Sequence, residues 1–513
     1  MRSNEIITAQ QAAQMISNGS TIATDGFIGA AFPEELALEI EKRYLSTGEP
    51  RDLTLIYGAG QGDAKDKGIN HFGHEGLINR VIGGHWGLAP KIQKLAIENK
   101  IEAYNFPQGV ISHMFRDIAA KKPGTITHIG LHTFVDPRLG GGRLNKRTQK
   151  DLVELIRIDE KEYLIYKYLP VDFAVLRGTT ADTNGNITME KEALTVEMLS
   201  VAQATKNSGG KVVVQVERVV PAGSLNPKEV VIPGIFVDAV VIASRAEYHM
   251  QTFGTMFEPA YCGMKSNNES DILQVTDSDN AERQIISRRA AMELEEGSII
   301  NLGLGMPEGI AQVVKEKNKA AHYSITVESG PIGGVPAGGL NFGCSSHPEA
   351  IIDQAYQFDF YQGGGLDVAF LGLAQTDRYG NVNVSKFGTK IAGCGGFIDI
   401  TQTAKKVIYC GTFTAKGLKI ACENGELKIL SEGYVKKFIE DVEQITFNGQ
   451  YANEKDQPVL YITERAVFKL TNKGLMLTEI APGIDLEKDI IKNMTFVPLI
   501  SSELKIMDSS IFI

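Results

Sequence analysis

Residues 7–22 read ITAQQAAQMISNGSTI, and the pattern returns late in the chain, where residues 285–300 read IISRRAAMELEEGSII. Each copy has an N-cap candidate, Thr8 or Ser287, and a short helical stretch with paired alanines that a glycine ends. A β-type run and a glycine-rich turn that closes with Pro-Glu follow in both copies. Proline is favoured in the first turn of a helix, because its missing N–H group has no helical partner there. Both copies therefore predict the order helix, strand, glycine loop, helix.

Two further matches follow the first in the same order along the chain. Residues 171–188 read VDFAVLRGTTADTNGNIT, and residues 366–384 read LDVAFLGLAQTDRYGNVNV. Both segments alternate apolar residues and reach the pattern Asp-x-x-Gly-Asn, whose Gly-Asn pair is typical of a turn between two strands. The last match pairs KVVV at 211–214 with KVIY at 406–409. A long-period repeat of this kind indicates duplicated structural units.

The three matches predict two homologous α/β halves, 1–270 and 280–513, joined by the polar stretch 266–280. Helical stretches that alternate with short β-branched runs predict open, mostly parallel sheets covered by helices. In such sheets ligands bind beyond the carboxyl ends of the strands. We therefore expect the active site to lie between the halves.

Composition limits the classes of function. Hydrophobic residues make up 43% of the chain and charged residues 22%, as in an ordinary globular protein. The net charge of −10 argues against a nucleic-acid partner, which needs clustered Lys and Arg. The polar start, Met1–Glu5, and the lack of a long apolar run predict neither a secretory signal nor a membrane span.

Cysteine and histidine spacing predicts no metal. The five cysteines show no CxxC pattern, which predicts reduced thiols in a cytoplasmic protein. His71 and His74 have a ligand-like spacing, as do His128 and His132, but no HExxH or carboxylate pattern accompanies either pair. We expect ordinary structural or surface histidines at these positions.

Glu328 is the strongest candidate for chemistry. It follows the strand-forming run SITV at 324–327 and precedes a Gly-Pro turn, so it is expected at the carboxyl end of a strand. A glutamate in such a position is usually a solvated loop carboxylate. The glycine-rich residues 333–343 favour a functional interpretation, because small residues let a substrate and backbone donors approach closely.

A second candidate is the turn Gly393-Cys394-Gly395-Gly396. Three glycines in four positions can gather successive N–H groups into a nest that binds an anion or an oxyanion. The same composition also fits a flexible turn without function. We interpret Cys394 as a small filler, because no His or Asn stands in a recognisable cysteine-protease context.

A third candidate is the loop Gly303-Leu304-Gly305-Met306-Pro307. Glu308 stands where the dinucleotide fingerprint GxGxxG requires glycine, so the fingerprint fails. A glycine loop that leads into a helix N-terminus still suits a phosphate, because the helix dipole favours negative charge there. A plain strand-to-helix turn fits the loop equally well.

Together these segments resemble the family I CoA-transferases, in particular the single-chain branch that contains acetate and propionate CoA-transferases. The resemblance covers nearly the whole chain and rests on the order of its landmarks. They are NFPQG at 105–109, TFVDPR at 133–138, VESG at 327–330, GCGGF at 393–397, TERAVF at 463–468 and EIAPG at 479–483.

The resemblance implies that Glu328 is the nucleophile of a ping-pong reaction and carries an acyl-glutamyl anhydride, then a glutamyl-CoA thioester. It implies that Gly393–Gly396 form the oxyanion hole, that Gly303–Pro307 line the CoA site, and that Gln108 and Gly109 face the acyl pocket. Coenzyme A would be a substrate and covalent intermediate, with no permanently bound cofactor. The implied partners are acyl-CoA, short-chain carboxylates and further copies of the chain in a homo-oligomer.

Other functions stay open on the sequence. In an acyl-CoA hydrolase water would replace the acceptor acid, and acid-dependent exchange measured against free thiol release separates the two. A non-catalytic ligand sensor on the same scaffold would need no nucleophile. Such sensors usually carry a DNA-reading helical module, which this sequence does not show. A nicotinamide oxidoreductase is disfavoured by the failed glycine fingerprint.

Overall fold

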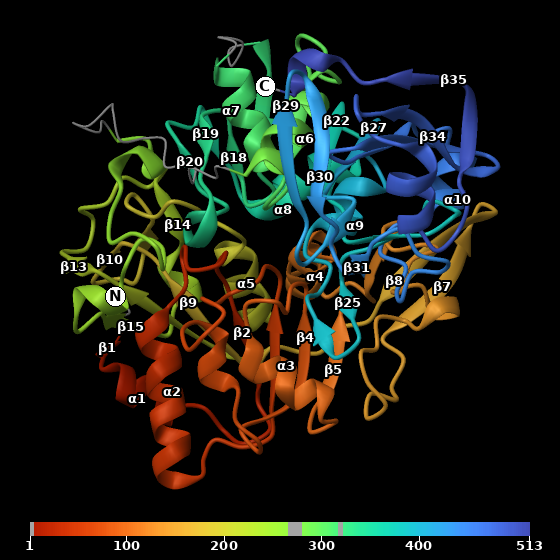
Figure 1. Cartoon of the computed structure of the whole chain (residues 1–513). Helices are drawn as coiled ribbons and strands as arrows, with labels where there is room; N and C mark the ends of the chain where they lie inside the picture. The colour runs from red at the N-terminus through yellow and green to blue at the C-terminus, as the bar shows by residue number, and fades with distance from the viewer. Residues whose placement is uncertain (1–4, 265–279, 317–321, 513) are drawn as a thin grey trace. The chain divides into compact units, whose positions relative to one another are not determined.

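A computed structural model describes residues 5–264, 280–316 and 322–512 (Figure 1). Almost all of the predicted joint, 266–280, and most of the polar start therefore lie outside the described residues. The chain divides into two compact units, each built from several segments. The first combines the described part of Met1–Ile272 with Val327–Asp359 and Thr389–Asp399, and the second combines the described part of Leu273–Thr326 with Phe360–Gly388 and Ile400–Ile513.

The first unit is built around an eight-stranded sheet in which every pairing is parallel. The inner strands are buried at nearly every position, as expected for a parallel sheet with both faces covered. In spatial order the strands are β1 (Glu5–Ile7), β15 (Ala239–Ile242), β12 (Lys211–Val216), β9 (Phe173–Arg177), β2 (Thr21–Thr24), β3 (Leu53–Tyr57), β4 (Ile78–Gly83) and β5 (Glu102–Asn105).

Helices and short strands complete the first unit. Its helices are α1 (Ala9–Gln14), α2 (Glu34–Thr47), α3 (Pro90–Ile97), α4 (Gln108–Ala119) and α5 (Met198–Asn207), and α8 (Gln354–Gln362) and α9 (Phe397–Thr401) begin in it. Its smaller strands are β6 (Thr125–Thr127), β7 (Val153–Ile158), β8 (Lys161–Tyr166), β10 (Thr180–Asp182), β11 (Ile187–Thr188), β13 (Arg218–Val220), β14 (Val230–Ile232), β18 (Pro331–Ile332), β19 (Val335–Pro336), β20 (Ser345–Ser346), β21 (Ala350–Ile351) and β26 (Lys390–Ile391).

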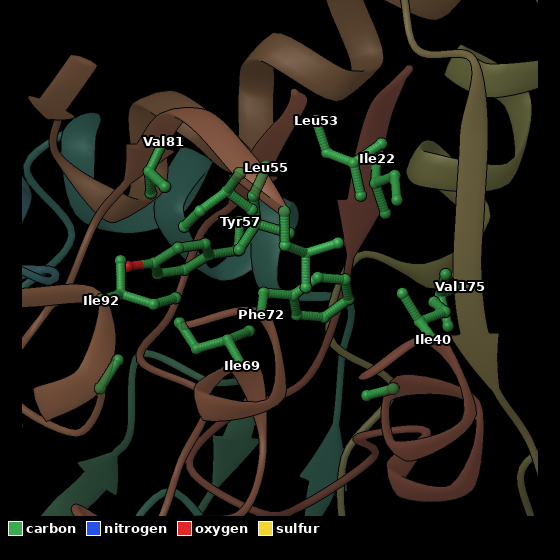
Figure 2. Packing of buried hydrophobic residues seen from close by; sticks show 14 of the residues in the cluster. Ile22, Ile40, Leu53, Leu55, Tyr57, Ile69, Phe72, Val81, Ile92 and Val175 are labelled. Carbon is green, nitrogen blue, oxygen red and sulfur yellow. The ribbon is translucent and has the colours of Figure 1, made fainter. Parts of the chain in front are cut away.

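One face of this sheet carries the core shown in Figure 2. Side chains alternate along a strand, so Leu53, Leu55 and Tyr57 of β3 point to the same face. Ile40 of α2 and Ile92 of α3 belong to the same buried cluster, which fixes these helices against the strands (Figure 2). This packing holds the carboxyl ends of β2 to β5 in place.

The second unit repeats the plan of the first. Parallel pairings join β17 (Ser324–Thr326), β16 (Ile299–Leu302), β22 (Val368–Gly372), β27 (Lys406–Cys410) and β32 (Val459–Ile462) in that spatial order. The sheet continues through β33 (Ala466–Thr471), β34 (Gly474–Ile480) and β35 (Leu499–Ile506). Its helices include α6 (Ala281–Ala291), α7 (Glu308–Glu316) and α10 (Gly449–Glu454). Its smaller strands are β23 (Gln375–Thr376), β24 (Val382–Asn383), β25 (Lys386–Phe387), β28 (Thr414–Ala415), β29 (Lys419–Glu423), β30 (Glu426–Ser431) and β31 (Val435–Lys436).

Strand order confirms the predicted fold class. The order β15-β12-β9-β2-β3 in the first sheet matches β32-β27-β22-β16-β17 in the second, and all these pairings are parallel. The two Asp-x-x-Gly-Asn segments also form equivalent turns, with left-handed φ values of 80° at Gly185 and 77° at Gly380. The half boundaries 1–270 and 280–513 stay a prediction, because the boundaries of the compact units do not coincide with them: the first unit also contains segments of the second half.

The helix starts agree with the sequence in one copy of the repeat and differ in the other. Thr8 caps α1, and its side chain and that of Gln11 form a capping box. The prediction for Ser287 is wrong: α6 begins at Ala281 after Asn280, and Ser287 is buried inside the helix. The residues before Ser287, AERQII, contain no helix breaker, so the helix starts about two turns earlier than the serine suggests.

The structure also shows the state of the cysteines and the character of the described helices. All five cysteines are free thiols. Among the helices that the structure describes, none has both the length and the apolar character to cross a membrane.

Candidate functional site

Glu328 lies just beyond the end of β17, as its sequence context predicts. The strand ends at Thr326, and residues 327–331 form a tight turn in which Val327 N donates to Pro331 O at 3.0 Å. The Glu328 side chain is largely withdrawn from solvent, with 9% of the residue exposed. A glutamate this buried is not the solvated loop carboxylate that its position alone would favour.

The glycine turn at 393–396 lies beside Glu328. A methyl group placed on Gly396 would come within 3.5 Å of Glu328 Cγ and 3.2 Å of the Phe358 ring. Gly396 therefore leaves room next to the carboxylate that any side chain would fill.

Two of the four amides in the turn are already committed. Cys394 N donates to Asn105 Oδ1 at 2.9 Å, and Gly395 N donates to Gly84 O at 2.9 Å. Within the described ranges Gly396 N donates to no other residue, and Gly396 is the glycine beside Glu328. The oxyanion role predicted for Gly393–Gly396 stays a prediction, and the geometry favours Gly396 as its donor.

The structure also brings Gln108 and Gly109 to the turn. They open α4, where Gln108 N donates to Gly395 O at 2.9 Å and Gly109 N donates to Asp399 Oδ2 at 3.1 Å. Gln108 is 2% exposed. Residues from distant parts of the sequence thus meet around Glu328 within one compact unit. Their role in an acyl pocket stays a prediction.

The loop Gly303–Pro307 belongs to the second unit, where it follows β16. Gly305 has a left-handed φ of 88°, and its N–H donates to Glu308 Oε1 at 2.9 Å. Arg283 Nη2 donates to Gly305 O at 2.7 Å. The carboxylate of Glu308 shows that the loop can place an N–H group against an anion. Since the loop and Glu328 lie in different units, its role in CoA binding stays a prediction.

Cys394 has the properties of a filler. The residue is buried, and its Sγ lies 3.5 Å from Phe106 O. Burial, with a smaller contribution from the Asp399 charge, raises the pKa of the thiol well above its ordinary value. A thiol that stays protonated is a poor nucleophile.

His85 lies against the glycine turn, and sequence reasoning missed it. Its Cδ2 lies 3.8 Å from the position of a methyl group on Gly395. Burial, with a smaller contribution from Lys390, lowers the pKa of His85 to about 4, so the imidazole is neutral at physiological pH. The glycines around it in GGHWG at 83–87 were the one available sequence signal.

A buried acidic pair was missed as well. Asp25 follows β2, and Glu197 immediately precedes α5. Burial is the main cause that raises the pKa of Asp25 to about 8. Burial and the neighbouring charges of Asp25 and Asp353 raise the pKa of Glu197 well above its ordinary value. Two buried carboxyl groups in contact cannot both be charged at low cost, so the pair keeps a proton near neutral pH.

No group of three or more His, Cys, Asp or Glu side chains in the described part of the chain is arranged to hold a metal ion. His71 and His74 contact Glu34 and Glu41 instead. These partners lie 30 to 37 residues earlier in the chain, so local spacing could not reveal them.

Comparison with known proteins places this site in a chemical context. The sequence profile of the family described as Coenzyme A transferase matches residues 6–243. A caffeate CoA-transferase of Acetobacterium woodii is 48% identical over 515 residues, which cover 99% of this chain and 97% of that protein. The acetate CoA-transferase YdiF of Escherichia coli (strain K12) is 44% identical over 509 residues, which cover 99% and 95%.

Solved structures give the same likeness in three dimensions. The crystal structure of an acyl-CoA transferase (YdiF) from Escherichia coli O157:H7, in a thioester complex with CoA, matches with a TM-score of 0.93 at 44% identity. The match covers 100% of this chain and 96% of that one. The similarity thus spans both sheets and every candidate segment described above.

Proposed function

The chain belongs to the coenzyme A transferase family, and we propose that it is a short-chain acyl-CoA:carboxylate CoA-transferase that works through a covalent intermediate on Glu328. The observation that carries this proposal is the buried side chain of Glu328 beside Gly396, where a methyl group would press against Glu328 Cγ and the Phe358 ring. A nucleophile next to a glycine that leaves room for a reacting carbonyl is the arrangement that acyl transfer needs.

The proposed reaction needs two exchanges at one carboxyl group. Ionised Glu328 attacks the thioester carbonyl of acyl-CoA, the carbon–sulfur bond breaks, and CoA thiolate and an acyl-glutamyl anhydride form. The thiolate then attacks the glutamyl carbonyl, which releases the first acid as its carboxylate and leaves glutamyl-CoA thioester. An incoming carboxylate runs the same steps in reverse. Electron pairs balance at each step without a proton transfer, so no Ser-His-Asp set is required.

Negative charge builds on a carbonyl oxygen at each tetrahedral stage. A fixed backbone N–H group directed at that oxygen contributes about 3 kcal/mol or more to the transition state. Gly396 N is the donor that the geometry favours for this part. Burial of Glu328 beside Phe358 also helps to keep water away from the anhydride and the thioester, which would otherwise hydrolyse.

The relatives support a covalent route and leave the acid open. The Escherichia coli acyl-CoA transferase was crystallised in a thioester complex with CoA, which is the kind of intermediate proposed here. One relative is a caffeate CoA-transferase and another an acetate CoA-transferase. We propose acetate and propionate as the acids. An aromatic acid such as caffeate is kept as the second candidate, because the caffeate enzyme is the more similar of these two relatives.

Substitution of Glu328 tests the proposal. We expect Glu328→Gln to abolish CoA exchange while the protein stays folded. Glu328→Asp should lose on the order of 100-fold, since the shorter side chain misplaces the attacking oxygen by about 1 Å. Incubation with acyl-CoA followed by borohydride should modify Glu328 alone. Glu102→Gln, which removes a carboxylate paired with Arg80 in the same unit, is the matched control and should keep full activity.

A panel of acceptor acids separates the remaining functions. Acetate, propionate, butyrate, hexanoate and caffeate would each be offered with one acyl-CoA donor, and acid-dependent exchange would be compared with release of free thiol. Thiol release without exchange would indicate a hydrolase, and neither reaction would indicate a ligand sensor. Normal exchange by Glu328→Gln would refute the proposed nucleophile.

The proposal also covers the cellular compartment, the oligomeric state and the two halves of the enzyme. We infer a cytoplasmic homo-oligomer with two homologous halves, 1–270 and 280–513. The free thiols of all five cysteines support a reducing compartment. Light scattering of the purified protein tests the oligomeric state.

A further inference from the structure

A chain of buried hydrogen bonds leads from Glu197 to Gln108. Gln354 Nε2 donates to Glu197 Oε2 at 2.7 Å, and Gln108 Nε2 donates to Gln354 Oε1 at 3.1 Å. Ser112 lies beside the chain, where its Oγ accepts from Gln354 Nε2 at 3.0 Å. Glu197, Ser112 and Gln354 are completely buried, and Gln108 nearly so. Buried polar groups in such a network depend on one another for their orientation.

The chain has a direction. The Glu197 oxygen that faces Gln354 accepts, so the amide nitrogen of Gln354 must face Glu197 and its oxygen must face Gln108. Because Gln108 Nε2 donates to Gln354 Oε1, the side-chain oxygen Gln108 Oε1 faces away from Gln354. That oxygen lies 3.7 Å from the position of a methyl group on Gly395, at the glycine turn. In the described part of the chain no donor reaches Gln108 Oε1.

Asp25 keeps Glu197 in the accepting state. Burial raises the pKa of both carboxyl groups, so the pair holds a proton near neutral pH. Whichever carboxyl group carries that proton, Glu197 Oε2 accepts from Gln354 Nε2 at 2.7 Å. The main chain supports the pair, because Glu197 N donates to Asp25 Oδ2 at 3.0 Å.

The backbone beside Glu197 is strained. Val196 has a φ of 42°, in the left-handed region that β-branched residues avoid. Strain of this kind persists only where the surroundings require it. Here the carbonyl of Val196 accepts from Gln354 N at 3.0 Å, so the strained residue ties together the segments that carry Glu197 and Gln354.

We propose that Glu197, with Asp25, is a positioning residue that acts through Gln354 to direct the side-chain oxygen of Gln108 at the substrate. This inference rests on the proposed function. An ionised short carboxylic acid carries no hydrogen-bond donor, whereas every acyl-CoA carries amide N–H groups in the arm that leads to its sulfur. Gln108 Oε1 therefore accepts from an amide of the CoA arm, and the contact serves all acyl donors alike.

Gln354→Met tests the chain, because methionine keeps the volume and removes the amide. We expect kcat/KM to fall roughly tenfold, the usual scale for a lost hydrogen bond with a displaced partner, and by the same factor for acetyl-CoA and butyryl-CoA. Gln215→Met is the matched control. Gln215 is also buried, and it bonds Glu35 N and Tyr248 O in the same unit, so its loss should affect stability and leave kcat/KM unchanged.

A pair of substitutions at Glu197 distinguishes a positioning role from a purely structural role. Glu197→Gln imitates the protonated carboxyl, since its oxygen can accept from Gln354 while its nitrogen can donate to Ser112 Oγ, which lies 3.1 Å from Glu197 Oε1. We expect it to recover most of the kcat/KM that Glu197→Ala loses. A thermal melt would show whether Glu197→Ala folds. If it does not, the kcat/KM of Gln354→Met alone decides whether the inference holds.

Three results would overturn the inference: normal kcat/KM in Gln354→Met, equal damage from Glu197→Gln and Glu197→Ala, or a loss confined to one acyl donor. Failure of the proposed function is distinguishable. In that case the unsubstituted protein would show no exchange, or Glu328→Gln would remain active.

Discussion

At Gly109 two properties of a single residue oppose each other. Alanine is more favourable than glycine in a helix by up to about 1 kcal/mol, the value for the interior, so propensity argues for a side chain even at Gly109 in the first turn of α4. A methyl group there would lie 2.6 Å from the Phe358 ring and 2.7 Å from Asp399 Oδ1. Contacts this short force a side chain or the backbone to move, which costs about 1–3 kcal/mol in a packed interior.

We therefore expect Gly109→Ala to lower the free energy of unfolding by about 1 kcal/mol after the gain in propensity is subtracted. CoA exchange should fall as well, because the same displacement shifts Phe358 beside Glu328. Urea unfolding and exchange assays measure the two effects. Gly372→Ala is the control, since no atom lies within 4 Å of its added methyl group. A more stable Gly109→Ala protein would contradict this reasoning.

Residue types predict the site only where the chemistry is local. Glu328 and the turn at 393–396 could be singled out, because a strand-end carboxylate and clustered glycines are visible in short segments. Gln108 was found through resemblance alone. Glu197 could not be found, because its function depends on Gln354, which lies 157 residues away in the sequence.

At the scale of elements, a cluster of charged side chains fastens α2 to the short helix η1 (Ile69–Phe72). His71 Nδ1 contacts Glu41 Oε2 at 2.5 Å, and His71 Nε2 contacts Glu34 Oε1 at 3.0 Å. Burial alone would lower the pKa of His71, but the hydrogen bonds that its ring donates to the carboxylates of Glu34 and Glu41 outweigh burial and raise the pKa to about 9. The imidazole is therefore charged in the folded state.

This raised pKa predicts how stability depends on pH. The ordinary pKa of histidine is 6.5, so the contribution of His71 is complete below pH 6.5 and is lost as pH rises through about 9. We expect His71→Gln to cost on the order of 3 kcal/mol at pH 6 and clearly less at pH 10, measured by urea unfolding against the unsubstituted protein.

A surface pair serves as the control for His71. His322 pairs with Glu296 on the surface, and a pair of this kind contributes only about 0–1 kcal/mol. His322→Gln should therefore change stability little at either pH. A stability difference for His71→Gln that is as large at pH 10 as at pH 6 would show that the imidazole charge contributes nothing.

Elements were predictable where their signals are local and less so at their ends. The capping box at Thr8 and the turns at Gly185 and Gly380 follow from short patterns, and the structure confirms them. The start of α6 was placed too late, because a serine near a helix start is a weak signal beside seven helix-compatible residues. The long parallel sheets were predictable from the internal repeat, whereas no single strand segment predicted them.

At the scale of the whole molecule, the compact units and the repeated halves divide the chain differently. Residues 327–359 lie in the second half of the sequence and belong to the first unit in space. Contacts within that unit show the dependence: the rings of Phe27 and Phe342 lie 5.9 Å apart, and His347 N donates to Ala260 O at 2.9 Å. The first unit is incomplete without this later segment.

We therefore expect residues 1–270, expressed alone, to unfold at a lower temperature and less cooperatively than the intact chain. Co-expression with 280–513 should restore a single cooperative transition, because the second fragment supplies the missing segment. Differential scanning calorimetry of the fragment, the pair and the intact protein measures this. Cooperative unfolding of 1–270 alone at the temperature of the intact chain would contradict the division into units.

The interleaved segments also constrain synthesis on the ribosome. The last piece of the first unit ends at Asp399, well over 100 residues after its main part is complete. At about 5–20 residues per second, the nascent chain waits about 6–25 s before that piece emerges. For the part of this interval before Phe342 emerges, the apolar surface around Phe27 is uncovered, so chaperones have a defined period in which to bind the growing polypeptide.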